Sequence, residues 1–226
     1  RDIISNSRNI KVPRWVKFSG TSNAELHIFC DASKRLYAAC AYLRVLGGER
    51  LSSNLVAAKS RLVTPKLLEI NFGPKFELLA CFLAVKLGNS ILEAVSELVG
   101  SLPVYCWTDS SICLGWIRGD ANKHDVFVRN RLLFIQSLSC VWGYVPTKDN
   151  PADLPTRGAL DLPSLWWSGP EWLQRPDSEW PSELSFSQSQ ASSCLVSVVN
   201  ASVAVYDADI VFAKRISRWR RLVRSV

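Results

Sequence analysis

The first part of the chain contains three short apolar runs separated by turn signals. A mostly apolar run at residues 26–31 ends in an acid, and residues 36–45 are rich in small and aromatic side chains. Gly47 and Gly48 mark a turn, and residues 51–61 form the third run. Short apolar runs bounded by turn residues are typical of strands. We therefore predict three strands joined by short turns in an antiparallel meander.

The apolar pattern then changes to a helical period. Phe76, Leu79 and Leu83 begin a series that recurs at helical spacing and continues to about residue 99. Small residues at positions 80, 81 and 84 share a face with Glu77. A face of small residues can pack close to a sheet, so we predict a long helix that lies against the three strands.

The pattern in the second half of the chain predicts further strands that alternate with helices. The expected elements are a strand at 104–109, helices at 110–117 and 127–138, and a strand at 141–145. Asn150 and Pro151 suit the start of a last helix, because Asn caps and Pro fits the first turn. Asp153 would lie in that first turn, and Pro155 and Gly158 keep the helix short.

This order of elements predicts the fold class. The long helix between the third and fourth strands makes a parallel crossover. We expect an α/β fold with a five-stranded mixed sheet, in which three antiparallel strands are followed by two parallel additions and helices cover the faces.

Composition fits one ordinary domain with appendages. The chain has 226 residues, of which 48% are hydrophobic, so a substantial core can be buried. No run of 18 apolar residues and no signal peptide pattern occurs, so a membrane span is not expected. The chain begins at Arg1 and contains no Met, which we interpret as a piece of a longer product.

The cysteines predict free, buried thiols in a reducing compartment. Seven cysteines are an odd number, none forms a Cys-x-x-Cys pair, and only two histidines are present. Structural zinc is therefore not expected. Cys30, Cys40, Cys81 and Cys106 lie inside apolar stretches, as buried thiols do.

Positive charge is concentrated at the end of the chain. The net charge is +7, but six of the 27 basic residues lie in residues 211–226, which contain no acid. The other 21 basic residues nearly balance the 20 acids, so bulk charge does not argue for nucleic-acid binding by the globular part. The spacing of Phe212, Ile216 and Trp219 predicts a basic amphipathic helix at 209–226. Docking on a neighbouring domain is favoured over contact with phosphate.

An aromatic patch follows the predicted sheet. Trp166, Trp167 and Trp172 are the aromatic residues of this patch. A packed cover over the domain is favoured over base stacking. The serine-rich residues 181–208 are typical of a linker, and residues 1–23 read as a polar lead-in.

Four acids stand at positions that can converge. Asp31 ends the first predicted strand and Asp109 ends the fourth, so the two lie side by side if these strands are parallel neighbours. Glu77 and Asp153 are expected in the first turns of their helices. Such a cluster repels itself unless cations hold it, and Mg²⁺ suits carboxylate oxygens. The alternative is that all four are ordinary acids at strand ends or helix N-termini, and acids are favoured at helix N-termini in any case, which covers Glu77 and Asp153.

At these residues the sequence resembles the ribonuclease H-like region of BEL/Pao-type retrotransposon polyproteins. The matching segments are FCDAS (29–33), AAKSR (57–61), FELLA (76–80), WTDS (107–110), FVRNR (127–131), VPTKDNPADL (145–154) and LWWSGPEWL (165–173). The resemblance implies a ribonuclease H-like domain at 24–180 with a Trp-rich C-terminal cover. It also implies that the basic helix leads toward an integrase.

The resemblance further implies a nuclease that degrades the RNA strand of RNA/DNA hybrids during reverse transcription. Asp31, Glu77, Asp109 and Asp153 match the family's order of acids and would be catalytic, holding two Mg²⁺ or Mn²⁺ ions. Groups that could touch the hybrid are Ser33, Lys59, Arg61, Ser110, Arg129 and Asn130. For each of these residues, the alternative that it is simply a polar side chain facing solvent carries at least equal weight.

The implied partners are the hybrid and the reverse transcriptase and integrase parts of the same polyprotein, without a membrane or a small-molecule cofactor. The implied location is an intracellular, cytoplasmic particle, with the nucleus as a second location. The same polyproteins include an aspartic peptidase, but no Asp here is followed by Thr-Gly or Ser-Gly.

Two departures from the family pattern are visible. The segment before Glu77 is usually of the Pro-Arg-Leu-Glu-Leu type, whereas this chain has GPKFE at 73–77, which shifts the expected helix start. Cellular ribonucleases H often place a mobile histidine near the fourth acid, but residues 145–153 contain none. Product release then depends on other groups, or activity is low.

Two rival functions follow from the same residues. An integrase-like nuclease would place its glutamate last, whereas Glu77 lies between Asp31 and Asp109. A catalytically inactive connection domain that only holds hybrid would be supported by the loss of an acid, but all four acids are present.

Overall fold

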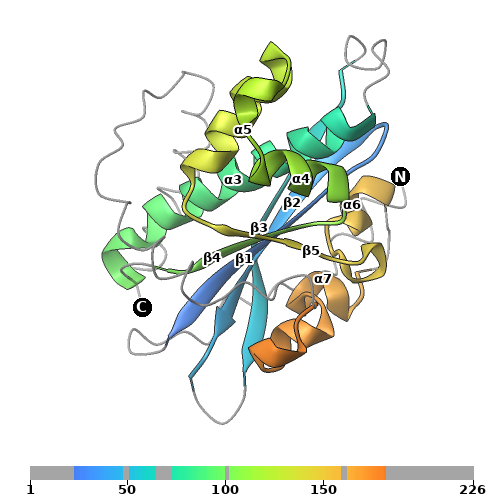
Figure 1. Ribbon diagram of the computed structural model, residues 1–226. Helices are drawn as coiled ribbons and strands as arrows, with labels where there is room; N and C mark the ends of the chain where they lie inside the picture. The colour runs from blue at the N-terminus through green and yellow to red at the C-terminus, as the bar shows by residue number, and fades with distance from the viewer. Residues whose placement is uncertain (1–22, 48–50, 65–72, 100–101, 159–161, 182–226) are drawn as a thin grey trace.

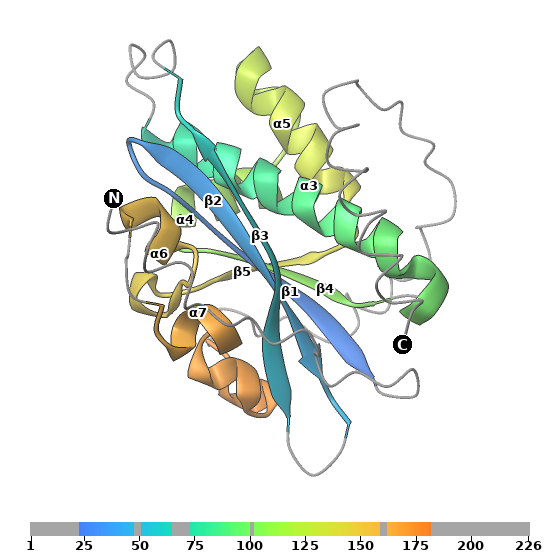
Figure 2. The ribbon, with the colours of Figure 1, turned by 180° about the vertical axis from the view of Figure 1, so that it is seen from behind.

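Five strands form one mixed sheet at the centre of the protein (Figures 1 and 2). The computed structural model describes residues 23–47, 51–64, 73–99, 102–158 and 162–181. The strand order is β3-β2-β1-β4-β5. The strands are β1 (Ala24–Ala32), β2 (Leu36–Val45), β3 (Ser52–Leu62), β4 (Val104–Thr108) and β5 (Val141–Tyr144).

The strand directions agree with those predicted from the sequence. β1 pairs antiparallel with β2, and β2 pairs antiparallel with β3. On its other side β1 pairs parallel with β4, which pairs parallel with β5. The predicted α/β fold, with three antiparallel strands and two parallel additions, is confirmed.

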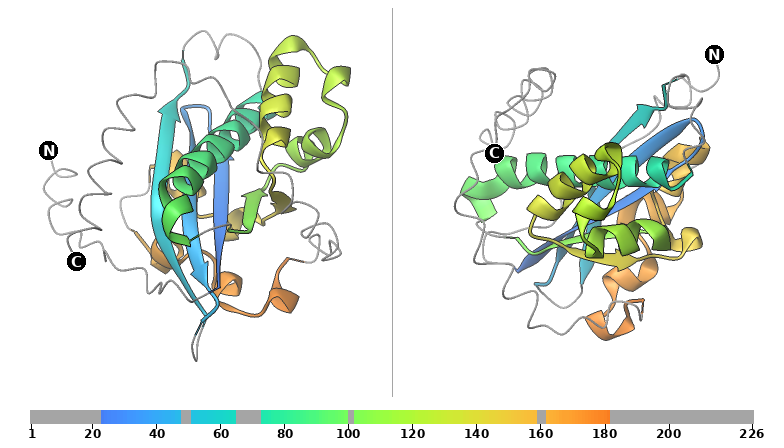
Figure 3. Two further views of the ribbon diagram at one scale, coloured as in Figure 1. Left: turned by 90° about the vertical axis from the view of Figure 1, so that its left-hand side faces the viewer. Right: turned by 45° about the horizontal axis from the view of Figure 1, so that its top comes forward.

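Helices cover both faces of the sheet (Figure 3). The α-helices are α3 (Gly73–Val99), α4 (Ser111–Arg118), α5 (Val126–Ser137), α6 (Asp153–Arg157) and α7 (Ser164–Ser168). Short 3-10 turns are η1 (Ala121–Lys123), η2 (Thr147–Asp149), η3 (Glu171–Gln174) and η4 (Asp177–Glu179). α3 lies across β1 and β2 and also contacts α5, whereas α7 and η3 contact β3.

Successive side chains of β1 point to opposite faces of the sheet, because side chains alternate along a strand. Leu26, Ile28 and Cys30 belong to the core beneath α3 and α5. Phe29 belongs to a second core together with Trp107, Trp172 and other residues on the opposite face. The long run of buried side chains in β1 follows from its central place between these two cores.

Residues 162–181, which we call the C-terminal cover, close the second core. Trp172 is buried against Trp107, with their ring centroids 4.6 Å apart. Tyr42 of β2 donates a hydrogen bond to the backbone oxygen of Trp166 at 2.9 Å. The sequence prediction of a packed cover agrees with this burial.

A buried arginine attaches the cover to the sheet. Arg44, at the end of β2, is 1% exposed and forms ion pairs with Glu25 at 2.6 Å and with Asp177 of η4 at 2.8 Å. Its guanidinium also donates to the backbone oxygens of Leu173 and Arg175. The cover is therefore held by directional bonds as well as by apolar packing.

A buried histidine completes this network. His27 Nδ1 accepts a hydrogen bond from Trp107 Nε1 at 3.2 Å, so the ring proton lies on Nε2 and is donated to Glu25. Burial lowers the pKa of His27, which keeps the ring neutral in spite of the neighbouring carboxylate.

Two helix starts differ from the sequence prediction. α3 begins at Gly73, because Pro74 fits the first turn of a helix, and Glu77 consequently lies in the second turn rather than the first. α6 begins at Asp153, so Asn150 does not cap it. Asn150 is instead fully buried and accepts a hydrogen bond from the Ala152 amide.

Further expectations concern the cysteines, the central helix and the two ends of the chain. Cys30, Cys40, Cys81, Cys106 and Cys113 are free and buried, and Cys140 is free and half-buried. Over Gly73–Val95 the central helix is long and apolar enough to cross a membrane, but half of this stretch is buried, as in the core helix of a globular domain. Residues 1–22 of the lead-in, nearly all of the linker and the basic helix at 209–226 lie outside the described residues.

Candidate metal centre

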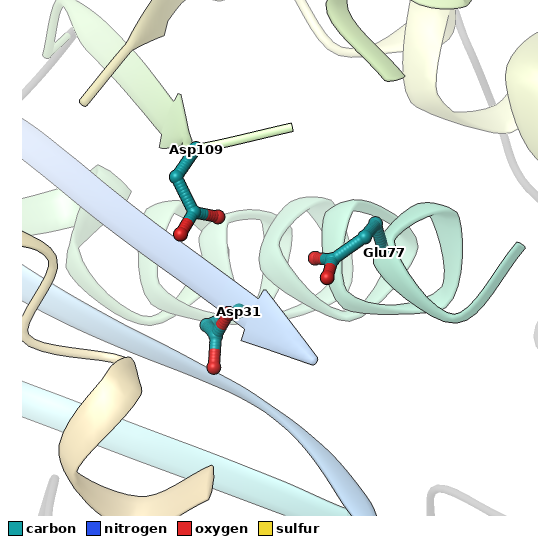
Figure 4. Close-up of side chains that lie close together, drawn as sticks. All are labelled: Asp31, Glu77 and Asp109. Atoms are coloured by element: carbon teal, nitrogen blue, oxygen red, sulfur yellow. The ribbon is translucent and has the colours of Figure 1, made fainter. Parts of the chain in front are cut away.

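Two aspartates meet where two parallel strands end. Cys30 of β1 is in register with Thr108 of β4, and each is followed by an aspartate. Asp31 is the residue after Cys30 and Asp109 the residue after Thr108, so the parallel register places them at the same edge of the sheet (Figure 4). The sequence prediction that these strand ends coincide is confirmed.

The third carboxylate comes from α3. Ala80, Cys81 and Ala84 are fully buried against the sheet, and Glu77 lies on the same face of the helix. Because these neighbours are small, the helix approaches the strands closely and Glu77 reaches the strand ends (Figure 4). Asp31, Glu77 and Asp109 each offer an oxygen, and these atoms all lie within 4.8 Å of one another.

The electrostatics of this three-carboxylate group oppose full ionisation. Burial, together with smaller contributions from the charges of Asp31 and Asp109, raises the pKa of Glu77 to about 8. Burial also raises the pKa of Asp109, with a smaller contribution from Asp31, while a hydrogen bond from Thr147 acts in the opposite direction. Like charges this close need a cation nearby to remain ionised together at neutral pH.

The residues present fit a divalent cation. Glu77 Oε2 is buried and has no hydrogen-bond partner among the described residues, although buried polar atoms normally have one. Carboxylate oxygens are the ligands that Mg²⁺ and Mn²⁺ prefer. A cation held by Asp31, Glu77 and Asp109 would satisfy this oxygen and reduce the repulsion.

The fourth predicted acid lies beside this group without belonging to it. Asp153 Oδ1 forms an ion pair with Arg157 Nε at 2.7 Å, one helical turn further along α6. Burial raises the pKa of Asp153, and the charge of Asp31 adds to this effect, which places the two acids within electrostatic reach. Among the residues that the structure describes, the cluster whose oxygens meet within 4.8 Å consists of Asp31, Glu77 and Asp109.

Two threonines of the segment between β5 and the end of α6 contact the aspartates. Thr156 Oγ1 is hydrogen-bonded to Asp31 Oδ2, and Thr147 Oγ1 donates to Asp109 Oδ2 at 2.8 Å. Sequence reasoning missed both. A signal existed for Thr156, because it follows Asp153 by three residues and so shares its side of a helix. Nothing comparable pointed to Thr147.

The candidate nucleic-acid contacts lie at three places around the sheet. Ser33 and Ser110 follow the two aspartates closely, but both hydroxyls are engaged locally, Ser33 in its turn and Ser110 as the N-cap of α4. Lys59 and Arg61 lie on the edge strand β3, and Arg61 is exposed. The last two candidates, Arg129 and Asn130, lie on α5. Contact with nucleic acid stays a prediction for all of them.

A family match agrees with this geometry. Residues 2–110 match the family described as the Pao retrotransposon-like RNaseH-like domain. The match includes Asp31, Glu77 and Asp109, whereas Asp153 lies beyond it. The resemblance to a retrotransposon ribonuclease H-like region is confirmed by this match. A comparison with curated proteins gave no match.

Several solved structures are similar to parts of the chain. The N-terminal ribonuclease H domain of a Mycobacterium tuberculosis protein, solved as a fusion with maltose-binding protein, is 12% identical with a TM-score of 0.41 and aligns 62% of this chain with 95% of that one. A foamy viral protease-reverse transcriptase in complex with double-stranded DNA is 14% identical with a TM-score of 0.34, over 57% of this chain and 25% of that one. A ribonuclease H1 in complex with an RNA/DNA hybrid is 12% identical with a TM-score of 0.32, over 57% and 88%.

Proposed function

We propose that this chain, whose residues 2–110 match the Pao retrotransposon-like RNaseH-like domain, is a metal-dependent endonuclease that cuts the RNA strand of RNA/DNA hybrids. The observation that carries the proposal is the group formed by Asp31, Glu77 and Asp109, whose oxygens lie within 4.8 Å of one another. Carboxylates brought together at the ends of parallel strands are suited to hold cations against a phosphodiester.

Asp31, Glu77 and Asp109 would hold the metal, with Asp153 as the fourth ligand beside them. Two divalent cations held there would, when bound, lower the pKa of a bound water and stabilise the leaving oxygen. The protein residues fix the positions of the ligand oxygens and exclude other nucleophiles. Burial raises the pKa of the Cys30 thiol to about 11, so this nearby cysteine is a poor nucleophile.

The proposed substrate would be recognised by shape rather than by base sequence. A hybrid close to A-form presents phosphates and 2′-hydroxyls to a protein surface. Arg61 on the edge strand and Asn130 on α5 are exposed, so their side chains are accessible to such groups. The same proposal makes the reverse transcriptase and integrase parts of the polyprotein the partners of this chain. It also places the chain in an intracellular particle.

Cleavage of a strand-labelled hybrid tests this function. The protein is incubated with hybrid, with double-stranded DNA and with single-stranded RNA, in Mg²⁺, in Mn²⁺ or in chelator. Asp109→Asn removes one ligand charge and should abolish cutting. Asp120→Asn is the matched control, because Asp120 accepts a hydrogen bond from the Asn122 amide in a turn and an asparagine oxygen can accept it equally.

Cutting of the RNA strand alone, lost with chelator and with Asp109→Asn but kept with Asp120→Asn, is the expected result. A folded wild-type protein that binds hybrid without cutting it in either metal would refute the nuclease. That result would favour the alternative, a catalytically inactive connection domain that holds hybrid for the polymerase.

A further inference from the structure

Thr156 is a buried hydroxyl aimed at the first aspartate of the site. It is 6% exposed, and its Oγ1 contacts both Asp31 Oδ2 and the backbone oxygen of Asp153. A hydroxyl has one proton, and a bond to a carboxylate is stronger than a bond to a neutral carbonyl. The proton of Thr156 is therefore donated to Asp31.

Thr147 makes the corresponding contact with the second aspartate. Thr147 lies in η2, and its hydroxyl donates a hydrogen bond to Asp109 Oδ2 at a distance of 2.8 Å. Along the sequence, Thr147 precedes Asn150 and Thr156 follows it. The two aspartates come from neighbouring strands, but both of their hydroxyl donors come from residues 147–156. One short segment thus contacts Asp31 and Asp109 together.

Asn150 ties this segment to the strand that carries Asp31. Its side-chain Nδ2 donates to the backbone oxygen of Cys30 at 3.0 Å, and its Oδ1 accepts the Ala152 amide at 3.1 Å. Asn150 is fully buried, so both bonds are shielded from water. The segment is consequently anchored to the residue that directly precedes Asp31.

These contacts leave ligand oxygens available. Each threonine occupies one oxygen of an aspartate, Oδ2 in both cases, and the other oxygen of each carboxylate remains for a cation. A hydroxyl bonded to one oxygen restricts rotation of the carboxylate about its Cβ–Cγ bond. The direction in which the remaining oxygen points is then fixed before a cation arrives.

We propose that Thr156 and Thr147 are positioning residues that orient Asp31 and Asp109 for divalent metal binding. This inference rests on the proposed metal centre. The segment between β5 and the end of α6 then contributes two things to the proposed centre. It provides Asp153, and its two threonine hydroxyls orient the aspartates of the strands. Groups that orient the ligands of a metal typically contribute 10- to 100-fold to metal affinity.

Metal binding without nucleic acid tests this proposal. Mn²⁺ is titrated calorimetrically into the wild type and into Thr156→Val, Thr147→Val, Thr156→Ser and Thr147→Ser. Valine has nearly the shape of threonine without the hydroxyl, whereas serine keeps it. Thr64→Val is the matched control, since Thr64 is an exposed threonine after β3. The thermal unfolding midpoint of each variant is measured in chelator.

The expected result is a Kd for Mn²⁺ that is about 10- to 100-fold higher in each valine variant and within about threefold of wild type in the serine variants and in Thr64→Val. If Thr156→Val does not fold, the exposed Thr147 decides the outcome with its own pair of variants. Equal Mn²⁺ affinity in the wild type and Thr147→Val would overturn the proposal for Thr147, and the same comparison decides Thr156.

This test separates the two proposals. A wild type that binds Mn²⁺ but cuts no hybrid would refute the nuclease and leave the positioning role to be decided by the variants. A wild type that binds no Mn²⁺ in the millimolar range, or that binds it equally after Asp109→Asn, would overturn the positioning role, because no cation would then occupy the carboxylates.

Discussion

Replacing Arg44 by alanine should destabilise the whole domain, because the arginine bridges the sheet and the C-terminal cover. It is 1% exposed and pairs with the buried Glu25 at 2.6 Å and with Asp177 at 2.8 Å. Two backbone oxygens of the cover also lose their donor in the variant. Removing one member of a buried pair costs about 3–5 kcal/mol, mainly because the other charge remains buried.

This cost is a large part of the free energy of unfolding of a typical domain, which is about 5–15 kcal/mol. For a domain of this size it corresponds to a fall in Tm of about 6–20 °C. Equilibrium urea unfolding followed by tryptophan fluorescence measures the change directly. Changing Glu25 to glutamine in the Arg44→Ala background should restore part of the loss, since the orphaned charge is then removed.

Arg175→Ala is the control for this experiment. Arg175 is also an arginine of the cover with two carboxylate partners, Glu171 at 3.3 Å and Glu179 at 3.2 Å, but all three side chains are largely exposed. Each exposed pair contributes about 0.2–1 kcal/mol. If Arg44→Ala cost no more than Arg175→Ala, the claim that the cover is bound through a buried ion pair would be wrong.

Two further predictions concern Glu77 of the metal centre and glycines of the helices α3 and α4. Without metal, the free energy of unfolding should fall by a few kcal/mol as the pH rises from about 4.5 to about 8, because Glu77 with its raised pKa of about 8 keeps a proton that the unfolded chain releases. Glu77→Gln should flatten this dependence in urea unfolding with chelator, and a flat wild-type profile would contradict the reasoning. Gly88→Val should lower the free energy of unfolding by about 1–3 kcal/mol, since a Cβ at this position of α3 would lie 2.7 Å from Ile28 Cδ1. Gly115→Ala in α4 should raise it by about 0.5–1 kcal/mol, because nothing lies within 4 Å of a Cβ there. Equal effects of the two substitutions in thermal unfolding would contradict this expectation.

The fold followed from the sequence because local patterns and topology agree. The apolar runs that end at Asp31 and Asp109 are strands, and the helical period that begins near Glu77 supplies the crossover that makes them parallel neighbours. The convergence of these three acids was therefore predictable. The start of α3 was placed too late, because Pro74 was not recognised as a first-turn residue.

The rest of the site depends on tertiary contacts that have no local signal. The hydroxyls of Thr147 and Thr156 reach the aspartates from a segment that Asn150 ties to β1 by a hydrogen bond to Cys30. Nothing in the sequence singles out Arg44, since arginine is seldom fully buried and its partners lie 19 and 133 positions away. Long-range pairing of this kind cannot be read from spacing within a segment.

The contact between Thr156 and Asp31 also has a consequence for synthesis of the chain on the ribosome. The two residues are 125 positions apart, and at about 5–20 residues per second this corresponds to roughly 6–25 s of translation. A nascent chain that has just emerged past Asp109 contains the three carboxylates Asp31, Glu77 and Asp109, but neither Thr147 nor Thr156 and no C-terminal cover. The proposed ordering of the metal ligands by Thr147 and Thr156 would therefore be completed late, when the last part of the domain is made, and not when the third carboxylate is added.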